Sequence, residues 1–149
     1  MSPSDAELIM ETLQEALAAE HAAVWAYGLA GAFVPDELAA KLHEATVTHQ
    51  ARRDATERLL IDAKVRPVPA EPGYLSPAPV TDAASALQLV ITAETDVAAA
   101  WRSVLERGPT EPGLRAAGLD ALTRAAVRAA RWRATAGIAP ATVPFPGVP

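Results

Sequence analysis

The sequence predicts an all-α protein, a four-helix bundle with one long proline-rich crossover between its second and third helices. Four long stretches are rich in Ala, Leu, Glu and Arg and contain little internal Gly or Pro, a composition typical of helices. Between the second and third stretches, five prolines fall within residues 67–79 and exclude a helix there. The chain has no cysteine, which excludes disulfides, thiolate metal ligands and a cysteine nucleophile.

The first two helices are expected at residues 5–33 and 36–64. Ser4 is a suitable N-cap, and Glu7 three residues later completes a capping-box pattern. Pro35 ends the first helix or occupies the first turn of the second, where its missing N–H breaks no hydrogen bond. Because the turn between these helices is short, we expect them to be antiparallel neighbours.

The crossover, residues 65–80, is expected to be extended and close to polyproline II. At about 3 Å per residue such a segment spans the whole bundle, so the third helix would run parallel to the second. One long crossover of this kind is typical of the ferritin-like topology rather than of the up-down topology. A structural strap is therefore favoured over a docking ligand for a proline-recognising domain.

The third and fourth helices are bounded by clear stop signals. The third is expected to begin after Thr81, a good N-cap, and to end at Gly108-Pro109. The fourth is expected to begin at Glu111-Pro112 and to stop at Gly137. Residues 139–149 are then expected to form an extended proline-rich tail.

An ionisable residue lies at the centre of the apolar face of each of the first three helices: Glu20, His49 and Glu94. Each lies about 13 residues from the helix end that would face the same end of the bundle, so at ~1.5 Å per residue their heights agree within about one turn. We therefore expect the three side chains to meet in mid-bundle as a buried polar cluster. Buried carboxylates must be paired, metal-bound or protonated.

Two arginines are candidate partners of this cluster. Arg53 follows His49 by one turn on the same face, and Arg128 borders the apolar face of the fourth helix, from which it could turn inward. The neighbouring arginines are expected to form a solvated face, on which Asp120 pairs with Arg124 four residues later.

Six stretches that together cover nearly the whole chain carry a family resemblance: Leu13–Gly28 (LQEALAAEHAAVWAYG), His49–Leu60 (HQARRDATERLL), Pro67–Leu87 (PVPAEPGYLSPAPVTDAASAL), Ala93–Leu105 (AETDVAAAWRSVL), Ala125–Arg133 (AAVRAARWR) and Pro144–Gly147 (PFPG). Through them the chain resembles an uncharacterised family of the ferritin-like superfamily, one catalogued as a domain of unknown function. The resemblance implies the ferritin-like fold and no established activity.

Ferritin-like di-metal proteins carry one Glu on each of two helices and a Glu-x-x-His pair on each of the other two. Glu20 and Glu94 match the single glutamates, and His49 matches the histidine of the second helix. Thr46 stands where that helix would carry its glutamate, and the fourth helix supplies neither Glu nor His. The pattern therefore disfavours a di-iron centre, and arginines near the site would replace the charge of a cation.

The sequence leaves three functions open. The leading hypothesis is a non-catalytic bundle without a cofactor, whose old metal site has become a salt-bridged polar core. The rival is an oxidase-like enzyme that binds Fe or Mn through Glu20, His49 and Glu94. The third is a binder of a small ligand in a mid-bundle cavity, which a cavity volume of a few hundred Å³ would favour.

Charge and aromatic placement give expectations about partners and location. The formal net charge of −5 disfavours nucleic-acid binding. No apolar stretch is long enough for a membrane span or a signal peptide, so we expect a cytoplasmic protein of one domain, residues 1–149. Trp25 lies off the Glu20 face and indicates a second buried face, which would suit a homodimer through the first two helices. We expect His21 at a helix interface or on the surface, and His43 in solvent.

Overall fold

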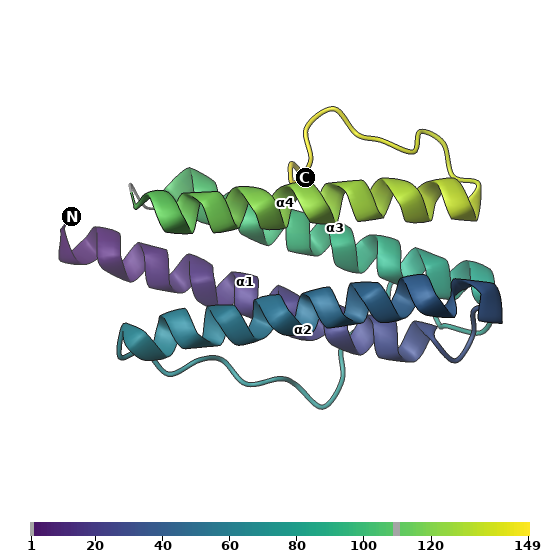
Figure 1. Ribbon diagram of the computed structural model, residues 1–149, viewed down its shortest axis with the longest axis horizontal. Coiled ribbons are helices and arrows are strands. Elements are labelled where there is room, and N and C mark those ends of the chain that lie inside the picture. The colour runs from purple at the N-terminus through teal and green to yellow at the C-terminus, as the bar shows by residue number, and fades with distance from the viewer. Residues whose placement is uncertain (1, 109–110) are drawn as a thin grey trace.

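The computed structural model describes residues 2–108 and 111–149, which form a bundle of four long helices (Figure 1). These helices are α1 (Pro3–Ala30), α2 (Ala39–Asp62), α3 (Ala83–Arg107) and α4 (Pro112–Ala136), and a short 3-10 helix, η1 (Asp36–Leu38), precedes α2. The described residues contain no strand. The predicted all-α four-helix bundle with a long crossover between its second and third helices is confirmed.

The first two helices begin at other residues than the sequence predicted. Ser2, and not Ser4, caps α1, because the Asp5 amide donates to the Ser2 hydroxyl and the Ser2 amide donates to the Asp5 carboxylate. Pro3 then occupies the first helical position, for which its fixed φ is suited. Residues 36–38, expected as the first turn of the second α-helix, form the tighter turn η1 instead.

The last two helices follow the expected pattern more closely. Asp82, one residue after the predicted Thr81, caps α3 through a capping box with Ser85. Gly137 ends α4 with φ 71°, a left-handed conformation that favours glycine. The predicted stop at Pro109 lies outside the described residues.

The helices do not pack equally against one another. α1 packs against α2 and α3, and α3 packs against α4. Between α2 and α4 lies a groove of about 480 Å³, lined by Ala51 and Ala55 on one side and by Ala117 and Asp120 on the other. None of the helices in the described part of the chain combines the length and the apolar character needed to cross a membrane.

The crossover runs along the outer side of α1, to which hydrogen bonds fasten it. Gln14 donates to the carbonyl oxygen of Arg66 at 2.7 Å and accepts from the amide of Val68 at 2.8 Å. His21, expected at a helix interface or on the surface, lies against the crossover, and its Nε2 atom donates to the Val68 carbonyl oxygen at 3.0 Å. Side chains of α1 therefore satisfy the backbone of a segment that has no secondary structure of its own.

Trp25 is covered by this crossover. Its ring meets the ring of Tyr74 edge-on, with centroids 5.8 Å apart. The crossover of the same chain therefore packs against the side chain that the sequence analysis took as the mark of a second buried face.

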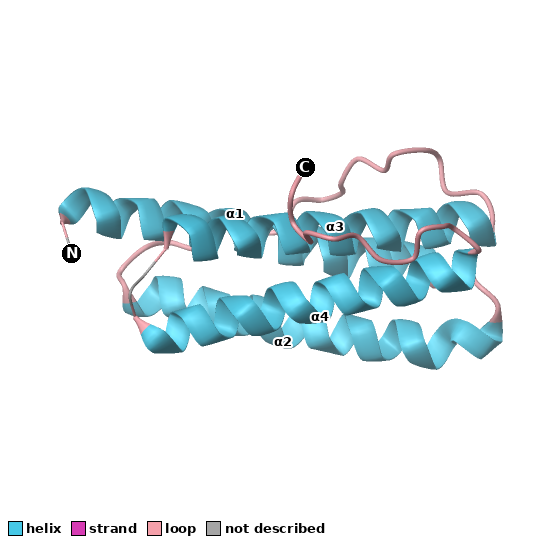
Figure 2. Ribbon diagram, turned by 90° about the horizontal axis from the view of Figure 1, so that it is seen from above, coloured by secondary structure: helices cyan, strands magenta, loops and turns pink. Residues whose placement is uncertain are grey.

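Apolar side chains fill the bundle on both sides of a polar layer. One cluster includes Ile9, Leu13, Leu17, Leu60 and Val104, and the other includes Ala30, Leu42, Leu87, Val90 and Ile91. Glu20, His49 and Glu94 lie in that layer with no exposed surface. The tail, residues 138–149, leaves the end of α4 and returns over α3 and α4 towards the middle of the bundle (Figure 2).

Candidate functional site

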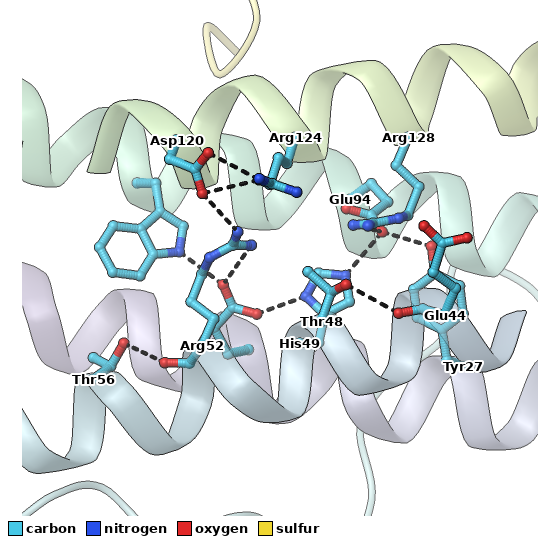
Figure 3. Close-up of polar contacts among 12 residues, drawn as sticks. Tyr27, Glu44, Thr48, His49, Arg52, Thr56, Glu94, Asp120, Arg124 and Arg128 are labelled. Carbon is cyan, nitrogen blue, oxygen red and sulfur yellow. Dashed lines mark hydrogen bonds and ion pairs between the residues drawn. The ribbon is translucent and has the colours of Figure 1, made fainter. Parts of the chain in front are cut away.

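The structure places Glu20 of α1, His49 of α2 and Glu94 of α3 in direct contact. The Nδ1 atom of His49 lies 2.6 Å from Oε2 of Glu20, and the Nε2 atom lies 2.8 Å from Oε1 of Glu94. All three side chains are 0% exposed. Figure 3 shows His49 at the centre of a polar network that reaches every helix of the bundle.

The imidazole ring of His49 lies between the two carboxylates, with one ring nitrogen facing each of them. A doubly protonated ring donates to both carboxylates at once, whereas a neutral ring has only one N–H group to donate. Burial alone would lower the pKa of His49, but the hydrogen bonds to Glu20 and Glu94 and their negative charges raise it to about 9. His49 is therefore an imidazolium at neutral pH.

Three aromatic side chains extend this network. Trp101 donates its indole N–H to Oε1 of Glu20 at 2.8 Å, and Tyr27 donates its hydroxyl to Oε1 of Glu94 at 2.5 Å. Trp132 of α4 then donates to the Tyr27 oxygen at 2.8 Å. Burial and the charge of Glu94 raise the pKa of Tyr27 well above its ordinary value of 10.0, so the hydroxyl keeps its proton.

The aromatic donors form a crossed pattern between α1 and α3. Tyr27 follows Glu20 by two helical turns on α1, and Trp101 follows Glu94 by two turns on α3. Each glutamate accepts from the aromatic residue of the other helix. No polar role was predicted for these aromatic residues from the sequence. The repeated spacing of glutamate and aromatic donor is the signal that could have revealed their polar role.

Two arginines approach the cluster, one at each carboxylate. Nη1 of Arg128 lies 3.5 Å from Oε1 of Glu94. Arg52 lies with Nη1 3.7 Å from Oε1 of Glu20 and with Nη2 3.7 Å from Oδ2 of Asp120 on α4. Both arginines are largely buried, with 12% and 16% of the Arg52 and Arg128 side chains exposed.

Arg53, which the sequence predicted as a partner of the cluster, points elsewhere. Its Nε and Nη2 atoms each lie 2.8 Å from Oδ1 of the neighbouring Asp54. Arg52 and Arg53 both follow His49 by about one turn, on opposite sides of its face. Asp120 of α4 lies on the Arg52 side, so Arg52 takes the place that we had expected for Arg53.

The carboxylates of Glu20 and Glu94 differ in how many of their oxygens accept a hydrogen bond. Glu20 accepts hydrogen bonds on both of its oxygens, one from His49 and one from Trp101. Glu94 takes its contacts with Tyr27, His49 and Arg128 on Oε1 alone. Its Oε2 atom is buried and has no donor among the residues that the structure describes. Nη1 of Arg52 likewise lacks a hydrogen-bond acceptor within those residues, although it faces Glu20.

The donor atoms of the cluster do not converge as metal ligands do. Glu20 and Glu94 face different nitrogens of the same ring, so the ring fills the space between the carboxylates. Among residues 2–108 and 111–149, no group of three His, Cys, Asp or Glu side chains has an arrangement suited to a metal ion. As they stand, these side chains fit a hydrogen-bonded ion cluster rather than a metal centre.

Fold and site together define the chain as a helical bundle with a buried carboxylate–imidazole–carboxylate cluster. The model of one family, described as domain of unknown function (DUF4439), matches residues 12–149, and the chain belongs to this family. Among solved structures, it is similar to the crystal structure of a conserved hypothetical protein, rv2844, from Mycobacterium tuberculosis. The sequences are 34% identical with a TM-score of 0.86, over 95% of this chain and 99% of that one. No protein of curated function matches the chain.

Proposed function

We propose that the chain is a non-catalytic bundle of ferritin-like ancestry, in which a salt-bridged core replaces an old metal site. The position of His49 carries this proposal. Its ring lies between Glu20 and Glu94, where it brings a positive charge to both carboxylates at once. An ion cluster of this kind ties the helices together and needs no cofactor.

The charges around the cluster support this function. Two carboxylates meet the imidazolium of His49 and the guanidinium groups of Arg52 and Arg128. A divalent cation placed among these groups would meet like charges at about 4 Å, each a repulsion of several kcal/mol in a partly buried environment. The glutamates therefore have their counter-charges from the protein itself.

The rival function, an oxidase-like enzyme with Fe or Mn on Glu20, His49 and Glu94, requires a rearrangement. His49 would have to lose a proton and leave its hydrogen bond with at least one of the glutamates. The two cationic arginines would also remain close to the metal. The rival is therefore less well supported by the geometry.

Metal analysis of protein purified without chelators tests the proposal. We expect far less than one Fe or Mn per chain, and no rise in melting temperature when either Fe²⁺ or Mn²⁺ is added. His49→Ala and His43→Ala serve as matched variants, because His43 lies on the same helix and is exposed. Stoichiometric metal that is lost in His49→Ala and kept in His43→Ala would overturn the proposal.

The homodimer, the cytoplasmic location and the absence of nucleic-acid binding stay predictions. The dimer no longer draws support from Trp25, whose ring packs against Tyr74. Light scattering on the purified chain measures the mass in solution: twice the 15.5 kDa of one chain would support the dimer, and the single value would contradict it.

A further inference from the structure

A cavity lies between α3, α4 and the C-terminal tail, and Glu94 forms part of its wall. Its volume is about 790 Å³, within the range of ~300–1,000 Å³ that is typical of small-molecule sites. Most of its lining is small or apolar, including Ala98 on α3, Ala126 and Ala130 on α4, and Val143 and Pro144 on the tail. Figure 1 shows the tail arching away from α4 over this region before it returns.

Glu94, which lines this cavity, has one carboxylate oxygen without a hydrogen-bond donor in the described residues. Its Oε1 atom already takes contacts from Tyr27, His49 and Arg128, whereas Oε2 is buried without a donor in the described residues. A buried acceptor that lacks a donor keeps the full cost of its lost hydration. A hydrogen-bond donor on a bound molecule would remove that cost.

The charges around the cavity favour a neutral donor. Arg128 lies 3.5 Å from Glu94, and Arg131 and Arg133 line the cavity itself. A cationic ligand would meet these guanidinium groups, while the carboxylate of Glu94 is already compensated by His49 and Arg128. A hydroxyl or a neutral N–H group supplies the missing donor without adding positive charge.

We propose that this cavity binds a small, neutral and mainly apolar molecule that donates one hydrogen bond from a hydroxyl or N–H group to Oε2 of Glu94. This goes beyond the structural role proposed for the cluster. The cavity uses the one carboxylate oxygen that the cluster leaves free. Metal analysis and ligand binding therefore test the two proposals separately.

The tail covers the outer side of the cavity, and hydrogen bonds hold it at both ends of its arch. Arg133 donates to the carbonyl oxygen of Pro140 at 3.3 Å, and Arg102 donates to that of Pro146 at 3.2 Å. Gly147 has φ 83°, and a Cβ atom there would lie 2.8 Å from the carbonyl oxygen of Ala98. Only glycine allows the tail to approach α3 so closely. Residues of the arch between these contacts line the outer side of the cavity.

Two probes that differ in a single donor test this inference: 2-naphthol, which carries a hydroxyl, and 2-methoxynaphthalene, its methyl ether. Binding to the full chain at pH 7 is followed by the fluorescence of the probe. We expect 2-naphthol to bind about tenfold more tightly or better, the ratio expected for a hydrogen bond to a charged group. Glu94→Gln should reduce this preference, because its amide replaces the charged acceptor.

A second pair of variants does not alter the cluster, so the test does not depend on the folding of Glu94→Gln. Ala130→Phe should fill the cavity and abolish binding of 2-naphthol. Ala117→Phe, the same substitution on the same helix in the α2–α4 groove, should leave it unchanged. Equal affinity for both probes, no binding of either probe, or undiminished binding to Ala130→Phe would overturn the proposal.

Discussion

Glu20 and Glu94 face the two sides of one imidazole ring, yet their surroundings differ. Glu20 accepts from His49 and Trp101 on separate oxygens, whereas Glu94 accepts from its partners on one oxygen, and its other oxygen has no donor in the described part of the chain. Glu94 also borders the cavity under the tail. The comparison shows that both carboxylate oxygens are paired at the Glu20 end of the cluster. At the Glu94 end, one oxygen has no donor in the described residues.

Removal of the His49 side chain should have the largest effect on stability, because both glutamates lose their shared counter-charge. We expect His49→Ala to lower the free energy of unfolding by about 3–5 kcal/mol, the cost of breaking a buried ion pair. Urea unfolding followed by circular dichroism measures it. His43→Ala, an exposed change on the same helix, should stay within ~0.5 kcal/mol of the wild type. A loss below ~1 kcal/mol in His49→Ala would show that the ion cluster contributes little.

The second largest effect should be a loss of stability at alkaline pH. The pKa of His49 is raised from 6.5 to about 9, so the folded state holds this proton more tightly than the unfolded state. Its contribution is complete below about pH 6.5 and is lost as the pH rises through 9, amounting to about 3 kcal/mol. The titratable groups in contact with the ring are Glu20, Glu94 and Tyr27, and Arg52 and Arg128 contact the two glutamates.

Unfolding experiments between pH 6 and pH 10 on the wild type and on His49→Ala isolate this contribution. The difference in unfolding free energy between the two proteins should shrink across that range. A difference that stays constant with pH would mean that the ring does not gain a proton on folding.

Amide substitutions compare the two carboxylates directly. Glu20→Gln leaves one acceptor for two donors, so the new N–H₂ group must face the N–H of either His49 or Trp101. Glu94→Gln can keep its oxygen at the Oε1 position and place the N–H₂ group where Oε2 has no partner in the described residues. We expect Glu20→Gln to cost about 1–2 kcal/mol more than Glu94→Gln. Equal costs, measured by urea unfolding, would remove the proposed difference between the two ends.

The smallest expected effect is the difference in stability between variants of the neighbouring residues Arg52 and Arg53. Arg52→Ala should lower the unfolding free energy by about 1 kcal/mol, because Glu20 keeps its two hydrogen bonds and loses only a longer contact. Arg53→Ala should change it by less than ~0.5 kcal/mol, since Arg53 pairs with the partly exposed Asp54. The reverse order in a thermal melt would support the original prediction for Arg53.

Composition, proline content and helix periodicity were sufficient to predict the bundle, the crossover and the level at which Glu20, His49 and Glu94 lie. It could not choose between Arg52 and Arg53, because that choice depends on how α2 is rotated towards Asp120. Nor could it show that the crossover covers Trp25, since an extended segment without periodicity carries no signal for the face on which it packs.

The polar roles of Tyr27, Trp101 and Trp132 were missed for a related reason. Each side chain packs as an apolar body and finds its hydrogen-bond partner on another helix. Such a partner is a property of the tertiary arrangement. The cavity under the tail also escaped prediction, because many of its lining residues are alanines and prolines, whose sequence pattern is typical of any helix and any loop.

The most direct test is a nuclear magnetic resonance titration of the His49 ring. If the ring replaces a metal ion between two carboxylates, both of its nitrogens carry a proton at pH 7.5, and the ring titrates near pH 9. A ring that is neutral at pH 7.5 and titrates at or below its ordinary value of about 6.5 would contradict the imidazolium at the centre of the cluster.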